Sequence, residues 1–284
     1  MENADLYISD NAQNCFDGCS LVSYGLGQSE AVTWAKLDYP HNSSGKQREA
    51  STKEEMSENS ITASNCRAKK NVRQKIATIS ADRMLTFTYR GAQLSLETIW
   101  EDFKVFLKYL NRLGVKLKYV VVAEKHKSGG YHLHLASSGF ISLRLLRQAW
   151  QKAITRGTGQ TDFSGENSPG NVQMAFQKNG SNRWRPVKLA VYLSKYVTKD
   201  LDAVEIGRHR YRCSIGIKIN KQVFYFEPVL GGGDKLSHYQ RIIQTLIGNQ
   251  FQSIFEYKEN YYWFATWEPP RYVDERRFDQ LVTN

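Results

Sequence analysis

One stretch, Tyr131-His132-Leu133-His134-Leu135, constrains the fold more than any other, because imidazole and apolar side chains alternate along it. On a β-strand, successive side chains point to opposite faces, so His132 and His134 should share one face while Leu133 enters the core. A second apolar run, 119–123, lies just upstream and ends at Glu124. Glycines at positions 129 and 130 favour a tight turn between the two runs. The sequence therefore predicts a β-hairpin.

This hairpin would place the carboxylate of Glu124 beside the imidazoles of His132 and His134. One carboxylate and two imidazoles with open coordination positions suit a divalent cation that must also hold a substrate. We expect Mg²⁺ or Mn²⁺, since Mg²⁺ prefers oxygen ligands whereas two imidazoles favour Mn²⁺ or a softer ion. A His-x-His pair on a strand also occurs without any metal, so the interpretation depends on a second segment.

That second segment is a predicted helix that begins near Pro186 and runs through Lys199. Tyr192, Tyr196 and Lys199 occupy positions i, i+4 and i+7, which is one helical face, and Lys195 flanks it. A phenol has a pKa near 10 and is a poor nucleophile unless its target is activated. A cation on a phosphate would supply that activation, and a lysine can stabilise the developing charge. The alternative is that the tyrosines cap a core and the lysines face solvent. A separate stripe can bury the helix: Leu189, Leu193 and Val197.

The remaining periodicity predicts the element order β-α-β-β-α-β-α-β. This order favours an α+β fold, a ferredoxin-like or RRM-like antiparallel sheet with helices packed on it. Expected strands are 84–89, 119–124, 131–137, 172–176 and 211–219, and expected helices are 95–110, 141–154 and 186–199.

Charge is distributed unevenly along the 284 residues, whose net charge is +11. Residues 1–60 hold ten acidic and four basic residues, a net of −6, so the rest of the chain carries +17. A body that basic favours a polyanionic partner such as nucleic acid. We expect three regions: an acidic, flexible segment at 1–75, a catalytic domain at 76–225 and a small accessory region at 226–284.

The sequence has no apolar run long enough to span a bilayer and no signal-peptide pattern at its start. We therefore expect a cytoplasmic protein without membrane contact. The chain also has no Gly-x4-Gly-Lys-Ser/Thr motif, and 231–235 is a poor imitation of one, so we expect strand unwinding to come from another protein.

Three motifs in order resemble those of the HUH endonucleases, specifically the rolling-circle replication initiators of phages and plasmids with two tyrosines. The first is the strand Met84-Leu85-Thr86-Phe87-Thr88, the second is His132-Leu133-His134, and the third is Tyr-x-x-x-Tyr-x-x-Lys at 192–199. The resemblance covers about 76–220. It implies the HUH endonuclease fold, a metal held by Glu124, His132 and His134, and catalysis by Tyr192, Tyr196, Lys195 and Lys199.

The resemblance also implies an activity, namely metal-dependent nicking and rejoining of one DNA strand at a replication origin through a 5′-phosphotyrosine. Single-stranded DNA, a host helicase and a host DNA polymerase are the implied partners. Two alternatives remain open. One is an HUH transposase, which would join transposon ends. The other is a non-catalytic single-stranded nucleic-acid-binding protein, with Phe87 and Tyr89 stacking on bases.

Overall fold

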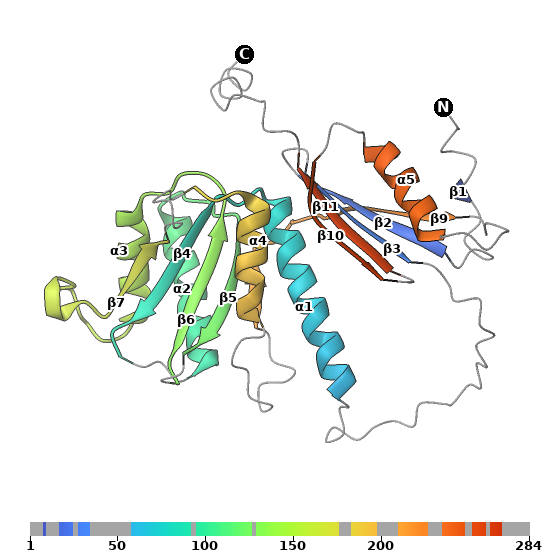
Figure 1. Ribbon diagram of the computed structural model, residues 1–284. Coiled ribbons are helices and arrows are strands. Elements are labelled where there is room, and N and C mark those ends of the chain that lie inside the picture. Colours follow the sequence, from blue (N-terminus) through green and yellow to red (C-terminus); the bar gives the residue numbers. More distant parts are fainter. Residues whose placement is uncertain are drawn as a thin grey trace, which may run out of the picture. The chain divides into compact units, whose positions relative to one another are not determined.

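The computed structural model describes eleven segments of the chain: 8–9, 17–24, 28–34, 58–91, 95–126, 129–175, 183–197, 210–226, 235–247, 252–259 and 262–268. The chain divides into two compact units, which are treated separately below (Figure 1). One comprises 48–218, and the other combines 1–47 with 219–284. Lys199 lies outside the described residues, as do Lys127 and Ser128 of the predicted turn.

The unit 48–218 contains a five-stranded antiparallel sheet with the order β7-β4-β6-β5-β8. From β4 onward, strands and helices follow the predicted order β-α-β-β-α-β-α-β, so the α+β class with helices packed on an antiparallel sheet is confirmed. The bounds are α1 Glu58–Thr78, β4 Arg83–Tyr89, α2 Leu96–Arg112, β5 Tyr119–Lys125, β6 Tyr131–Ser137, α3 Leu143–Ile154, β7 Gly170–Met174, α4 Pro186–Ser194 and β8 Tyr211–Cys213; 3₁₀ turns cover Gly165–Asn167 and Lys195–Val197.

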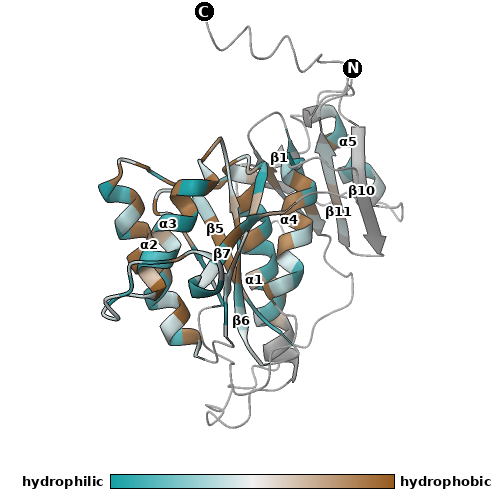
Figure 2. Cartoon of the chain, turned by 90° about the vertical axis from the view of Figure 1, so that its left-hand side faces the viewer, coloured by the Kyte–Doolittle hydropathy of each residue, from teal (hydrophilic) through white to brown (hydrophobic). Residues whose placement is uncertain are grey.

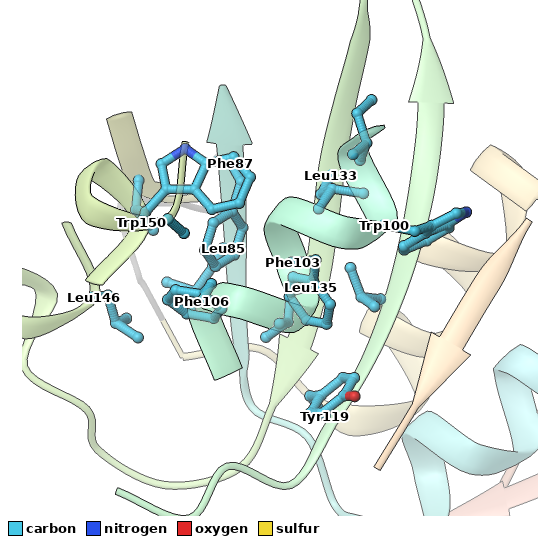
Figure 3. Close-up of a cluster of buried hydrophobic side chains, with 14 of the residues drawn as sticks. Leu85, Phe87, Trp100, Phe103, Phe106, Tyr119, Leu133, Leu135, Leu146 and Trp150 are labelled. Atoms are coloured by element: carbon cyan, nitrogen blue, oxygen red, sulfur yellow. The ribbon is translucent and has the colours of Figure 1, made fainter. Parts of the chain in front are cut away.

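Helices cover both faces of this sheet. Helices α2 and α3 pack on one face over an aromatic core in which the ring of Phe87 meets those of Phe106 and Trp150 at 5.0 and 5.2 Å (Figure 3). Helices α1 and α4 pack on the other face, over the buried residues Val120, Val122 and Ala136. Figure 2 shows α2 and α3 with apolar and polar faces, as expected of helices that cover a sheet on one side.

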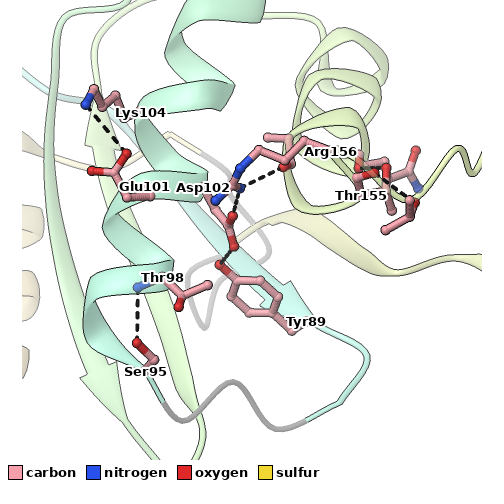
Figure 4. Close-up of polar contacts among 11 residues, drawn as sticks. Tyr89, Ser95, Thr98, Glu101, Asp102, Lys104, Thr155 and Arg156 are labelled. Atoms are coloured by element: carbon pink, nitrogen blue, oxygen red, sulfur yellow. Dashed lines mark hydrogen bonds and ion pairs between the residues drawn. The ribbon is translucent and has the colours of Figure 1, made fainter.

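Helix α2 begins where the sequence predicts, because Ser95 caps it. The Ser95 hydroxyl accepts a hydrogen bond of 3.2 Å from the backbone N–H of Thr98, which satisfies one of the free donors of the first turn (Figure 4). Farther along α2, the buried carboxylate of Asp102 accepts hydrogen bonds from the Tyr89 hydroxyl, at 2.7 Å, and from Arg156. These contacts tie α2 to the end of β4 and to the residues that follow α3.

The predicted hairpin is present. Strands β5 and β6 pair in register, with Glu124 opposite His132 and Val122 opposite His134. The backbone N–H of His126 donates to the carbonyl of Gly130 at 2.8 Å, and Gly129 has a φ of 86°, the region that favours glycine. The turn chemistry read from the sequence is therefore the chemistry that closes the hairpin.

The second unit is a six-stranded antiparallel sheet with the order β1-β9-β2-β3-β11-β10 and a helix, α5. Its core joins Cys19 and Leu21 to Tyr239 and Ile243 of α5 and to Trp263. The bounds are β1 Ile8–Ser9, β2 Asp17–Ser23, β3 Ser29–Trp34, β9 Asn220–Phe226, α5 Lys235–Ile247, β10 Gln252–Glu259 and β11 Tyr262–Glu268.

The predicted domain boundaries differ from this arrangement. The segment 1–75, which we expected to be flexible, contributes β2 and β3 to the second sheet and most of α1 to the first unit. The region 226–284 is not separate either, because β11 pairs with β3, and β9, which begins before it, pairs with β2. The two ends of the chain form one sheet because each supplies strands whose apolar faces cannot be buried alone. Among the described helices, none combines the length and apolarity that crossing a membrane requires.

Candidate active site

The candidate site lies on the sheet face that α1 and α4 cover. His132 and His134 alternate with core leucines on β6, and Glu124 is the register partner of His132 on β5. Residues that are partners across antiparallel strands project to the same face. All three predicted metal ligands therefore share this face, beside the buried valines Val120 and Val122.

Glu124 and His134 are in direct contact. Their ligating atoms, Oε2 and Nε2, are 2.5 Å apart, and both side chains are buried. An ionised carboxylate only accepts hydrogen bonds, so Nε2 carries the hydrogen in this contact. On the other side of the ring, Nδ1 lies 3.2 Å from the hydroxyl of Thr86, the register partner of His134 on β4. Both nitrogens of this imidazole are thus held.

His132 has different neighbours. Its ring lies 4.2 Å from that of His126, which follows Glu124 by two residues. Burial lowers the pKa of His132, and the nearby imidazoles of His126 and His134 lower it further, against the opposing effect of Glu124. The lowered pKa favours the neutral imidazole, which is the form that binds metal ions. Sequence reasoning assigned no role to His126, although its spacing from Glu124 was a usable signal.

The donor set fits a divalent cation. A buried carboxylate oxygen already faces an imidazole nitrogen, and a second, half-buried imidazole lies at the adjacent register position of the same face. In the part of the chain that the structure describes, however, no three His, Cys, Asp or Glu side chains form a ready metal-binding group. Glu124, His132 and His134 remain the predicted ligands, and Glu124 and His134 are the pair whose donor atoms meet.

Both tyrosines of the predicted nucleophile pair reach this site. The ring of Tyr196 stacks on that of His134 at 4.5 Å, and its hydroxyl donates a hydrogen bond of 2.7 Å to the hydroxyl of Tyr192. Tyr192 is the more exposed of the two, and its ring lies 5.3 Å from that of Trp184. The buried stripe of Leu189, Leu193 and Val197 anchors the segment as predicted. Helix α4 ends at Ser194, so Tyr196 sits in the 3₁₀ turn that follows.

The protonated phenol is strongly favoured at Tyr196. Burial raises its pKa first, and the hydrogen bond that it donates to Tyr192 and the negative charge of Glu124 raise it further. A nucleophilic role for Tyr196 therefore needs a change in its surroundings that removes this bias, such as neutralisation of Glu124 by a bound cation. Of the two predicted lysines, Lys195 is exposed on the same segment, and Lys199 lies outside the described residues.

The aromatic platform of the non-catalytic alternative is contradicted. Phe87 is fully buried on the opposite face of the sheet, among Phe103, Phe106 and Trp150. Tyr89 packs against Trp150, and its hydroxyl is bound to Asp102. Neither ring is available to stack on a base, because alternation along β4 turns both toward α2 and α3.

Comparison with known proteins supports the domain. Residues 82–201 match a family model described as replication-associated protein ORF2 (gene II protein), and this range contains β4, the hairpin and both tyrosines. No curated protein and no solved structure matches the chain. Residues 82–201 therefore form a domain of this replication-associated protein family, the phage rolling-circle replication initiators of the HUH type.

Proposed function

We propose that the domain at 82–201 nicks and rejoins one strand of DNA at a replication origin, in an HUH-type fold. The observation that carries the proposal is the stacking of Tyr196 on His134, whose other neighbour is Glu124. A candidate nucleophile and candidate metal ligands thus meet at one point. The family match supports initiation of rolling-circle replication rather than transposition.

In the proposed reaction, the phenolic oxygen of Tyr192 or Tyr196 attacks a backbone phosphorus, and the bond from phosphorus to the 3′-oxygen breaks. The phenol loses its proton and the leaving 3′-oxygen gains one, so a 5′-phosphotyrosine and a free 3′-OH result. The phosphodiester is conserved in the phosphotyrosine, so a later attack by a 3′-OH can rejoin the strand. Host polymerase would extend the 3′-OH, and a host helicase would unwind the duplex.

The chain's own residues would divide the work as follows. Glu124, His132 and His134 would hold Mg²⁺ or Mn²⁺, which when bound polarises the phosphate and offsets its charge. Thr86 would orient His134 through Nδ1, and Lys195 and Lys199 would stabilise the charge that develops on phosphate. The buried stripe of α4 holds both phenols at the site, which favours attack over diffusion of a free nucleophile.

A direct test is adduct formation. The protein is incubated with Mn²⁺ or Mg²⁺ and single-stranded oligonucleotides tiled across the genetic element that encodes it, and denaturing gels report a covalent protein–DNA species. We expect an adduct with a small set of overlapping oligonucleotides, and a free 3′-OH on the released fragment. Absence of any adduct across the complete tiling, with both ions, would contradict the proposal.

A further inference from the structure

Helix α1 is strongly basic and lies outside the range that matches the family. Five basic residues fall within nine positions, and Glu58 is the only acidic residue of the helix. Arg67 and Lys69 are exposed. The basic positions are Arg67, Lys69, Lys70, Arg73 and Lys75.

The position of α1 along the sheet follows from two hydrogen bonds. Arg210 donates to the side-chain oxygen of Asn65 at 2.6 Å, and the carbonyl of Arg210 accepts from the backbone N–H of Ala123 at 3.2 Å. Asn65 is therefore near the residue that precedes Glu124. At a rise of about 1.5 Å per residue, Lys69 is only about 6 Å farther along the helix axis. The exposed bases of α1 thus lie at the level of the candidate site.

Helix α1 also neighbours the helix that carries the tyrosines. Val72 and Ile76 pack in one core with Leu189 and Leu193 of α4, and Figure 1 shows the two helices side by side. The solvent side of α4 presents Lys188, Tyr192 and Lys195. The unit 48–218 as a whole has 30 Lys and Arg against 14 Asp and Glu, a net charge of +16.

We propose that Arg67 and Lys69 of α1 bind the phosphate backbone of single-stranded DNA beside the nicking site, and so extend the DNA-binding surface beyond 82–201. This inference rests on the proposed function of the neighbouring site. Phosphate contacts by lysine and arginine carry little sequence information, but they fix the position of the strand on the protein. The α1 surface would hold the strand while the hairpin and the tyrosines act on one phosphate.

The simpler explanation of a basic helix is a solvated face that binds nothing. The two explanations differ in salt dependence, because each phosphate contact releases counterions when it forms. Two contacts on single-stranded DNA should contribute about 1.4 to the slope of log K against log salt. A solvated face contributes only through the general field of the protein, which any surface charge shares equally.

The experiment uses the full chain with chelator, so that binding is measured without cleavage. Fluorescence anisotropy of a labelled single-stranded oligonucleotide is recorded at several salt concentrations for wild type, R67E/K69E and K116E/K118E. Lys116 and Lys118 are exposed, and they precede β5 at the end of the strand opposite Glu124. Both double variants change the net charge equally, which makes the second a matched control.

We expect R67E/K69E to weaken binding by roughly tenfold or more and to reduce the salt slope by one to two units, with an unchanged melting temperature. The control variant should lose much less affinity. Equal affinities of the two variants, while the wild type still forms the covalent adduct, would overturn the inference alone. Failure of the wild type to bind single-stranded DNA would overturn the proposed function as well.

Discussion

The hydroxyl of Tyr196 donates a hydrogen bond of 2.7 Å to the hydroxyl of Tyr192. The two phenols therefore meet at their reactive ends, although Tyr192 belongs to α4 and Tyr196 to the 3₁₀ turn after it. One hydroxyl is bound to the other and the second is open to solvent, so the pair is asymmetric at rest. A strand that displaces this contact would release both oxygens at the same place.

We predict that both tyrosines act as nucleophiles, one in initiation and the other in strand closure. Tyr192→Phe and Tyr196→Phe should each retain part of the covalent adduct on a single-stranded oligonucleotide, because either phenol can reach the site. The double variant should form none. If one single variant loses all adduct while the other nicks and rejoins as wild type does, the protein uses one tyrosine.

The histidines should be needed for cleavage and not for folding. His132→Ala and His134→Ala are each expected to abolish nicking and to lower Mn²⁺ affinity, because each removes one of three ligands. Isothermal titration with Mn²⁺ and the melting temperature separate loss of metal from loss of fold. Nicking by His132→Ala in the presence of chelator would refute the metal site.

Thr86 should act through His134. Bound metal would take Nε2, so Nδ1 must then carry the hydrogen, and the Thr86 hydroxyl can accept it. We expect Thr86→Val to weaken Mn²⁺ binding by about 10- to 100-fold, the usual effect of removing such a support, whereas Thr86→Ser should remain near wild type. Thr88→Val, in the same strand and on the same face, is the control and should leave Mn²⁺ affinity unchanged.

The Tyr89 hydroxyl should contribute to stability and not to chemistry. It donates to the buried carboxylate of Asp102, which also binds Arg156 (Figure 4). Tyr89→Phe leaves one carboxylate oxygen without this donor and should lower the free energy of unfolding by about 1–3 kcal/mol. Urea unfolding measures the change. Mn²⁺ affinity of the folded variant should equal that of wild type, because the contact lies on the opposite side of the sheet.

Stability of the metal-free protein should depend on the protonation of His132. Its pKa in the folded state is below the ordinary 6.5, so the unfolded chain binds the proton more tightly. The contribution is full above pH 6.5 and is lost as the pH falls toward the lower, folded-state pKa. Urea unfolding from about pH 7.5 to about pH 5 should show this decrease, and His132→Asn should show a smaller one. Identical pH profiles for the two proteins would contradict the assignment.

Local patterns were enough to predict the catalytic half of the molecule. Alternation along β6, the glycine turn and the cap at Ser95 act over a few residues, and each was visible without a structure. The buried stripe of α4 likewise followed from helical spacing. The order of these elements then left few ways to arrange the sheet, because hairpins pair and helices cross over between strands.

The tertiary structure decided what depends on distant partners. Strands β2 and β3 come from an acidic region without sustained periodicity, and they are ordered by pairing with β9 and β11 from the other end of the chain. Helix α1 is polar overall, so only its packing against α4 shows that it is part of the domain. The contacts of Thr86 with His134 and of His126 with His132 also arise from folding, because register and rotamer choice bring those side chains together. Sequence spacing determines which face a residue occupies, whereas long-range pairing and burial determine what it touches.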